Sequence, residues 1–87
     1  MYRLENQTNG HNKFYEVWAG AFTNMKTDIA ETAFVGCKYG RIGTQGRVIF
    51  KDFTGRYCKG EAYQYARQKV EEKLNRGYTL IRNDESE

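Results

Sequence analysis

A tyrosine and an arginine separated by one glycine, Tyr39-Gly40-Arg41, form the most promising chemical group in this chain. An arginine can donate two parallel hydrogen bonds to a phosphate, and an aromatic ring can stack on an exposed base or sugar. The glycine between them lets a ligand approach the backbone closely. The same segment could instead be structural, with the Tyr39 ring packed on its neighbours and Arg41 in an internal ion pair. Spacing alone leaves both alternatives open.

The segment around this group is strongly basic. Residues 38–59 contain six Lys or Arg and one acid, a balance of +5, although the whole chain has a net charge of only +3. A concentrated basic segment in a nearly neutral domain favours an anionic partner on one face. Outward-facing basic strands can also serve solubility alone, so charge by itself does not decide between the two. The candidate phosphate contacts in this segment are Arg41, Arg47 and Lys51.

The residue types that catalysis needs are not combined in any recognisable way. His11 is the only histidine, it lies in a predicted turn, and no local feature couples it to Cys37 or Cys58. The acidic residues are scattered, and Glu71-Glu72 belong to the solvated face of a predicted helix. Two cysteines and one histidine cannot supply the usual four ligands of a zinc site. We therefore expect no catalysis, no metal and no small-molecule cofactor.

Length and composition favour one small, soluble, intracellular domain. The 87 residues include no proline, and 39% are hydrophobic and 15% aromatic, which excludes a disordered or collagen-like chain. A charged fraction of 29% and a mean hydropathy of -0.86 exclude a membrane-spanning segment, and the first ten residues lack the apolar region of a secretory signal. Two cysteines are too few for a secreted disulfide scaffold, so free thiols in a reducing, cytoplasmic compartment are expected.

Alternating and β-branched stretches predict an antiparallel sheet. The turn signal Asn9-Gly10 separates the first two strands, polar residues 23–28 follow as a loop, and glycines in residues 43–46 form another turn. Tyr39 is expected on the same face as Val35, because side chains alternate along a strand. The predicted strands are residues 2–7, 12–22, 29–42 and 47–53, and the aromatic residues expected in the core are Phe14, Trp18, Phe34 and Phe50.

One helix is predicted after the sheet. Residues 61–77 change to helical spacing, and their final glycine fits the left-handed conformation that ends many helices. Ala62, Ala66 and Val70 are small enough to let this helix lie close to the sheet. The expected fold class is α+β, an antiparallel sheet of four or more strands with one helix on one face and the other face free. The remaining residues of the helical stripe are Tyr65, Lys69, Lys73 and Leu74, and residues 54–60 are expected as a connection.

Three ordered blocks of the sequence resemble the WGR domain. This family is named for a Trp-Gly-Arg motif that is usually followed by [IV]-G-x-x-G, and here Tyr39-Gly40-Arg41-Ile42-Gly43-Thr44-Gln45-Gly46 stands in its place. The preceding block is NKFYEVW, and the following block is EAYQYARQKVEEKLNRGY. The resemblance extends over about residues 2–81. We therefore expect a single WGR-like domain at residues 1–82, followed by a frayed acidic tail at residues 83–87.

The resemblance implies a function as well as a fold. WGR domains occur in DNA-damage-responsive poly(ADP-ribose) polymerases, where they bind DNA breaks and help transmit that binding to the catalytic part, and they also occur in bacterial proteins. In the polymerases the motif Trp stacks on a strand end, the motif Arg lies close by, and an Asn-Lys pair contributes to the DNA-facing surface. Carried over to this chain, these roles fall on Tyr39, Arg41, Asn12 and Lys13. No catalytic polymerase domain lies within these 87 residues, so no ADP-ribosyl transfer is implied.

Tyrosine stands where the family has tryptophan. Stacking contributes about 1–3 kcal/mol per base, and the smaller ring of Tyr39 is expected to lose part of it. Phosphate binding through Lys13, Arg41, Arg47 and Lys51 depends less on the ring. The sequence thus predicts a bacterial or phage-like DNA-binding module with a role in DNA repair and no membrane partner. The alternative is an accessory module of a larger DNA-processing system, which docks another polypeptide on its sheet edge or aromatic face.

Overall fold

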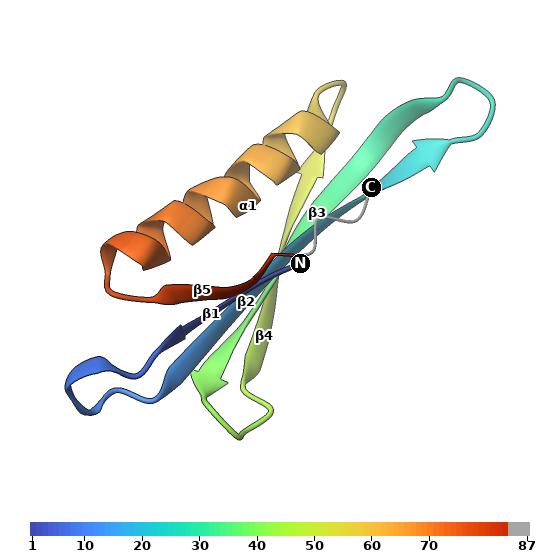
Figure 1. The fold of residues 1–87 in the computed structure, drawn as a ribbon. Coiled ribbons are helices and arrows are strands. Elements are labelled where there is room, and N and C mark those ends of the chain that lie inside the picture. The colour runs from blue at the N-terminus through green and yellow to red at the C-terminus, as the bar shows by residue number, and fades with distance from the viewer. Residues whose placement is uncertain (84–87) are drawn as a thin grey trace.

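Five antiparallel strands and one long helix make up the fold in the computed structural model, which describes residues 1–83 (Figure 1). The strand order is β4-β3-β2-β1-β5, and α1 lies across one face of the sheet, so the expected α+β class is confirmed. The acidic tail expected at 83–87 lies outside the described residues except for Asn83, which ends the last strand. The elements are β1 (Tyr2–Asn6), the 3-10 turn η1 (Thr8–Gly10), β2 (Lys13–Asn24), β3 (Ile29–Arg41), β4 (Arg47–Thr54), α1 (Cys58–Asn75) and β5 (Thr79–Asn83).

Two predicted boundaries are wrong by a few residues. The β2–β3 hairpin stays paired as far as Asn24 and Ile29, so only residues 25–28 form the loop. The backbone carbonyl of Asn24 accepts a hydrogen bond of 2.8 Å from the Asp28 N–H, and its side-chain Oδ1 accepts one of 2.8 Å from the Lys26 N–H. These two bonds close the turn. The helix begins at Cys58 rather than at residue 61, which shortens the predicted connection.

The core lies between α1 and the face of the sheet that we call the inner face. Val17 and Val35 project from β2 and β3 into this layer and are 1% exposed or less. Burial of such side chains stabilises the fold by about 1.5–3 kcal/mol each. The helix presents Ala62, Ala66 and Val70 to the sheet, as the sequence predicts, and these small residues let the two layers approach. Leu74 is 42% exposed, so its assignment to the buried stripe is wrong.

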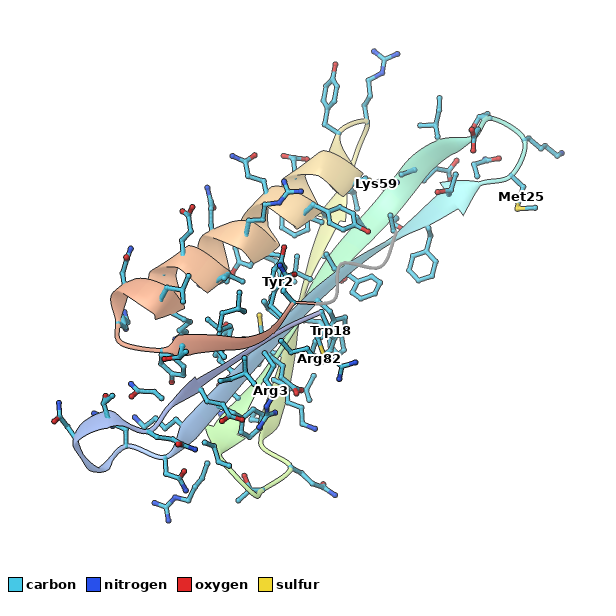
Figure 2. All side chains as sticks on the ribbon, viewed as in Figure 1. Tyr2, Arg3, Trp18, Met25, Lys59 and Arg82 are labelled. Atoms are coloured by element: carbon cyan, nitrogen blue, oxygen red, sulfur yellow. The ribbon has the colours of Figure 1, made fainter. Side chains whose placement is uncertain are left out.

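The opposite side of the sheet, which we call the outer face, holds three aromatic residues that the sequence analysis assigned wrongly to the core. Trp18 and Phe34 are half-buried and Phe50 is 65% exposed, whereas Phe14 is buried as expected. Strand alternation is the reason: Trp18 follows the inward-facing Val17, and no described element covers the outer face. Figure 2 shows Trp18 on the side of the sheet away from α1.

Both cysteines are free and buried. Cys37 lies in β3, and the Sγ of Cys58 at the start of α1 donates a long hydrogen bond of 3.7 Å to the Ala30 carbonyl. No three potential metal-ligating side chains among residues 1–83 gather closely enough to hold an ion. Within the same part of the chain, no helix has both the length and the apolar character needed to cross a membrane.

Candidate nucleic-acid interface

A hollow of about 550 Å³ opens where the last turns of α1 pass over the ends of β2 and β3. The strand register pairs Lys13 with Arg41 and Tyr15 with Tyr39, so two cations and two rings come from adjacent strands. The helix adds a lysine, and the segment after the helix adds a third tyrosine. We call this site the tyrosine hollow. Its lining residues are Lys13, Phe14, Tyr15, Tyr39, Gly40, Arg41, Ile49, Lys73 and Tyr78.

The Tyr39 ring is held by a second ring beneath the helix. Tyr39 and Tyr15 stack with their centroids 6.0 Å apart and their planes inclined by 18°. Tyr15 is 6% exposed, and this burial raises the pKa of its phenol above the ordinary value. Tyr39 stays half-buried, with part of its ring at the hollow. A ring fixed in this way loses little conformational freedom when a ligand stacks on it.

Two glycines allow the turn after the motif to fold back against β3. Gly46 has a φ of +73°, and a Cβ there would lie 2.5 Å from the Tyr39 carbonyl oxygen. A Cβ on Gly40 would lie 2.8 Å from the Gly46 Cα, so this glycine makes room for the turn rather than for a ligand, contrary to our expectation. The Arg41 carbonyl also accepts hydrogen bonds from the backbone N–H and the Oγ1 of Thr44, at 3.1 and 2.7 Å. The glycines therefore position the motif residues.

Arg41 and its neighbours present free cationic groups at the rim. Arg41 and Lys13 are exposed, and no acid within residues 1–83 forms an ion pair with either of them. The internal ion pair considered for Arg41 is thus not formed in the described part of the chain. Asn12 is also exposed, and its backbone carbonyl accepts a hydrogen bond of 3.0 Å from the Ile42 N–H, which ties the start of β2 to the end of the motif strand.

The two candidate residues on β4 lie at different distances from the hollow. Arg47 pairs with Tyr39 across the β3–β4 ladder and is exposed beside the motif. Lys51 pairs with Val35 four residues further along the strand, about 13 Å away. Its Nζ lies 5.3 Å from the centroid of the Tyr65 ring, over the middle of α1. The structure therefore brings Arg47 close to Tyr39 and leaves Lys51 apart.

Lys73 completes the hollow, although the sequence analysis did not nominate it as a site residue. Its Nζ lies 4.6 Å from the ring centroid of Tyr15 and 5.8 Å from that of Tyr78. Partial burial, followed by repulsion from Arg76, lowers the pKa of Lys73. Its position in the sequence could have indicated this role, because Lys73 lies on the helical stripe three residues after Val70, which is buried. A lysine at such a position either extends its ammonium group along the apolar surface into solvent or binds an anion.

The charges of the tyrosine hollow all have one sign. Lys13, Arg41 and Lys73 are its only charged lining residues within the described chain. The carboxylates of Glu5 and Glu16 are bound on the outer face by Arg3, at 3.0 and 2.8 Å. Three cations beside three tyrosine rings can bind a phosphate together with a base or sugar.

These features define a small α+β binding domain with an aromatic, anion-attracting hollow. The model of the WGR domain family matches residues 1–85, so the chain belongs to the WGR domain family. This is a family of nucleic-acid-binding modules that serve as binding or accessory domains rather than catalytic ones. Neither a curated protein nor a solved structure matches the chain.

Proposed function

We propose that this chain binds DNA by placing its phosphates and an exposed strand end in the tyrosine hollow. The observation that supports this proposal is the combination of three cations and three tyrosine rings, with no acid of the described chain among the lining residues. Lys13, Arg41 and Lys73 bind backbone phosphates, and Arg47 extends the basic rim along β4. Tyr39 offers its ring to a terminal base or sugar.

The half-buried position of Tyr39 favours strand ends and nicks over uninterrupted duplex. A continuous duplex presents mainly phosphates to the rim, because its bases are stacked on one another. A strand end also exposes a terminal base and sugar, which can reach a ring inside a hollow. Binding through three or four phosphates releases counterions, so log K against log salt is expected to fall with a slope of roughly -3 to -4.

A titration with defined DNA substrates tests the proposal. Fluorescence anisotropy is measured with 5′-phosphorylated blunt duplex and nicked duplex, with closed circular DNA as competitor, at several salt concentrations. Tyr39→Ala is expected to lose about 5- to 150-fold in affinity for ends and nicks, the equivalent of one stacked base, and little for closed circles. Arg41→Ala is expected to weaken binding to every substrate and to reduce the salt slope by about 1.

Matched substitutions away from the hollow serve as controls. Tyr57 is 73% exposed just before α1, and Arg67 is exposed on the helix, so Tyr57→Ala and Arg67→Ala are expected to bind as the wild type does. Lys51→Ala shows whether the DNA contact extends along β4. Binding that is independent of salt, or variants at Tyr39 and Arg41 that bind normally, would contradict the proposal. Equal loss on linear and circular DNA would leave only nonspecific phosphate contact.

The finer predictions from the sequence extend this proposal. We propose a single domain at residues 1–82 that acts on DNA inside the cell, in the cytoplasm of a bacterium or phage host, in DNA repair. The second candidate function is docking of another polypeptide, and the exposed aromatic residues of the outer face favour it. The two functions use opposite faces of the sheet and are therefore compatible in one protein.

A further inference from the structure

Four aromatic side chains form a connected cluster on the outer face, which we call the aromatic face. The ring centroids of Trp18 and Phe50 lie 6.1 Å apart with planes inclined by 84°, and those of Phe34 and Phe50 lie 6.2 Å apart at 65°. Phe22 joins the cluster through Phe34 at 6.0 Å. The first two contacts are edge-on, the arrangement that aromatic pairs favour, and the third pair is tilted by 35°. The cluster is therefore an ordered surface.

Two glycines make space for these rings on the neighbouring strands. A Cβ on Gly36 would lie 2.3 Å from Trp18, and a Cβ on Gly20 would lie 2.6 Å from Phe34. Neither glycine has a positive φ, so the backbone conformation does not require it. The space above each glycine is filled by a ring from the adjacent strand instead. Gly20 and Gly36 thus shape the outer face for aromatic packing.

The aromatic face remains open to solvent in the single chain. Phe22 is 67% exposed, Phe50 65% and Val48 45%. All three lie on the outer face, Phe22 on β2 and the other two on β4, with β3 between them. Monomeric proteins seldom expose a contiguous group of large apolar side chains unless it binds something. Covering these residues would remove a large apolar surface from water and would therefore be favourable.

The charges beside the aromatic face are of both signs and suit a second copy of the same surface. Lys38 pairs with Val48 in the ladder, and Asp52 pairs with Phe34, so the two charges flank Phe50 at opposite ends. Within residues 1–83, neither charge forms an ion pair. Consider a two-fold axis that lies between two copies packed face to face, parallel to both sheets, perpendicular to the strands and beside Phe50. Rotation about this axis brings Lys38 of each copy towards Asp52 of the other. A nucleic acid would instead require a single, positive sign.

We propose that two copies of this chain pack with their aromatic faces together, related by this two-fold axis. Sheets that pack face to face bury their facing side chains in a layer about 10 Å thick. The helices then lie on the outside, and the two tyrosine hollows point away from one another. The proposed dimer does not depend on DNA binding. If the hollow binds DNA, the dimer holds two strand ends at once.

Sedimentation velocity and intrinsic fluorescence, both without DNA, test the dimer from about 1 µM to about 1 mM protein. Trp18 is the only tryptophan and lies within the aromatic face, so its emission reports directly on burial of this surface. The dimer mass is expected to appear as concentration rises, together with a shift of the emission to shorter wavelength. A protein that stays monomeric throughout this range overturns the proposal.

Neighbouring residues of β4 give a matched pair of variants. Phe50 and Ile49 are exposed on opposite faces of the same strand, at 65% and 47%. Phe50→Ser is expected to weaken association by at least about tenfold, as for a central interface residue, and Ile49→Ser by less than about twofold. Asp52→Lys is expected to weaken association by about tenfold too, because it repels Lys38 of the other copy. Equal association of the two serine variants overturns the proposal.

Other occupants of the aromatic face would be revealed by the same reporter. A single-stranded oligonucleotide that quenches Trp18 in monomeric protein would assign this face to nucleic acid and overturn the dimer. Phe50→Ser is also titrated with nicked duplex, and it is expected to keep the wild-type affinity for each hollow. If the wild type binds nicked duplex but stays monomeric, only the dimer proposal fails. If it forms the dimer but does not bind DNA, only the DNA-binding proposal fails.

Discussion

The half-buried ammonium group of Lys73 is expected to make the proposed DNA binding depend on pH. Partial burial and the charge of Arg76 disfavour its charged form and lower its pKa below the ordinary value of 10.5. In the unfolded chain the pKa of Lys73 is not lowered. At pH values between the folded-state and the unfolded-state pKa, the unfolded state therefore binds more protons, and the contribution of Lys73 to stability rises with pH. A phosphate in the hollow favours the charged form, so DNA affinity is expected to fall as pH rises through the folded-state pKa.

Replacement of Lys73 by glutamine tests its role in the hollow. Lys73→Gln is expected to lose about tenfold or more in DNA affinity and to reduce the salt slope by about 1, because it removes a charged phosphate contact. Its melting temperature is expected to change little, because the loss of the ammonium contacts with the Tyr15 and Tyr78 rings is offset by the removal of a partly desolvated charge. Anisotropy titrations at pH 7 and pH 10 measure the affinity, and the variant should show a weaker pH dependence than the wild type.

Lys69 offers the matched control one turn earlier on α1. Its Nζ lies 3.7 Å from a Glu72 carboxylate oxygen and 5.3 Å from the Tyr65 ring centroid, outside the hollow. Lys69→Gln is therefore expected to bind DNA nearly as the wild type does. If both lysine variants lose affinity equally, the effect comes from overall charge, and Lys73 has no special place in the site.

At the scale of the element, the turn between β3 and β4 shows why glycines recur after the motif. Gly43 and Gly46 both have positive φ, at +93° and +73°. The Cβ position of Gly43 is open, whereas that of Gly46 is filled by the Tyr39 backbone and the Phe14 ring. Both positions thus require a left-handed backbone conformation, and only at Gly46 would a side chain also clash with its neighbours.

This difference predicts unequal costs for the same substitution. Gly43→Ala is expected to lower the free energy of unfolding by about 1–2 kcal/mol, the cost of a left-handed residue with a Cβ. Gly46→Ala is expected to cost more than about 3 kcal/mol, because it adds a clash with the strand that holds Tyr39 to the same strain. Urea unfolding measures both. Equal costs would show that the contact of the turn with β3 is unimportant.

At the scale of the whole molecule, the domain is long and narrow. Its principal extents are 51 × 23 × 18 Å, and the β2–β3 hairpin projects past the start of α1 (Figure 1). Met25 at the hairpin tip is 97% exposed and points into solvent (Figure 2). The tip of the hairpin is paired through its backbone as far as Asn24 and Ile29, and most side chains of residues 22–29 are exposed, so its stability is local.

Hydrogen exchange measures this gradient of stability along the hairpin. Amides of residues 22–31 are expected to exchange at least about tenfold faster than hydrogen-bonded amides of residues 14–18 and 35–39, because opening the tip exposes little buried surface. The measurement is made at a protein concentration below that of any self-association. Uniform protection along both strands would mean that the hairpin and the helix-covered core open as one unit.

Much of the fold could be predicted because it follows from local patterns. Alternation along β3 placed Tyr39 on the same face as Val35, and both do lie on the inner face. The small residues at Ala62 and Ala66 identified the helix side that contacts the sheet. Alternation could not say which face of β2 the helix covers, because Trp18 and Val17 are both apolar neighbours. That ambiguity is why Trp18, Phe34 and Phe50 were assigned to the core.

The sequence by itself determined the positions of the first four strands and of the helix along the chain, because the periodicity that sets them acts over short distances. Its resemblance to the WGR family placed Lys13, Tyr39 and Arg41 in one site. Only the tertiary structure decided that Lys73 and Tyr78 complete this site and that Lys51 lies apart from it. The crossing of α1 over the sheet sets these distances, and it depends on how the two layers pack rather than on the order of residues in the chain.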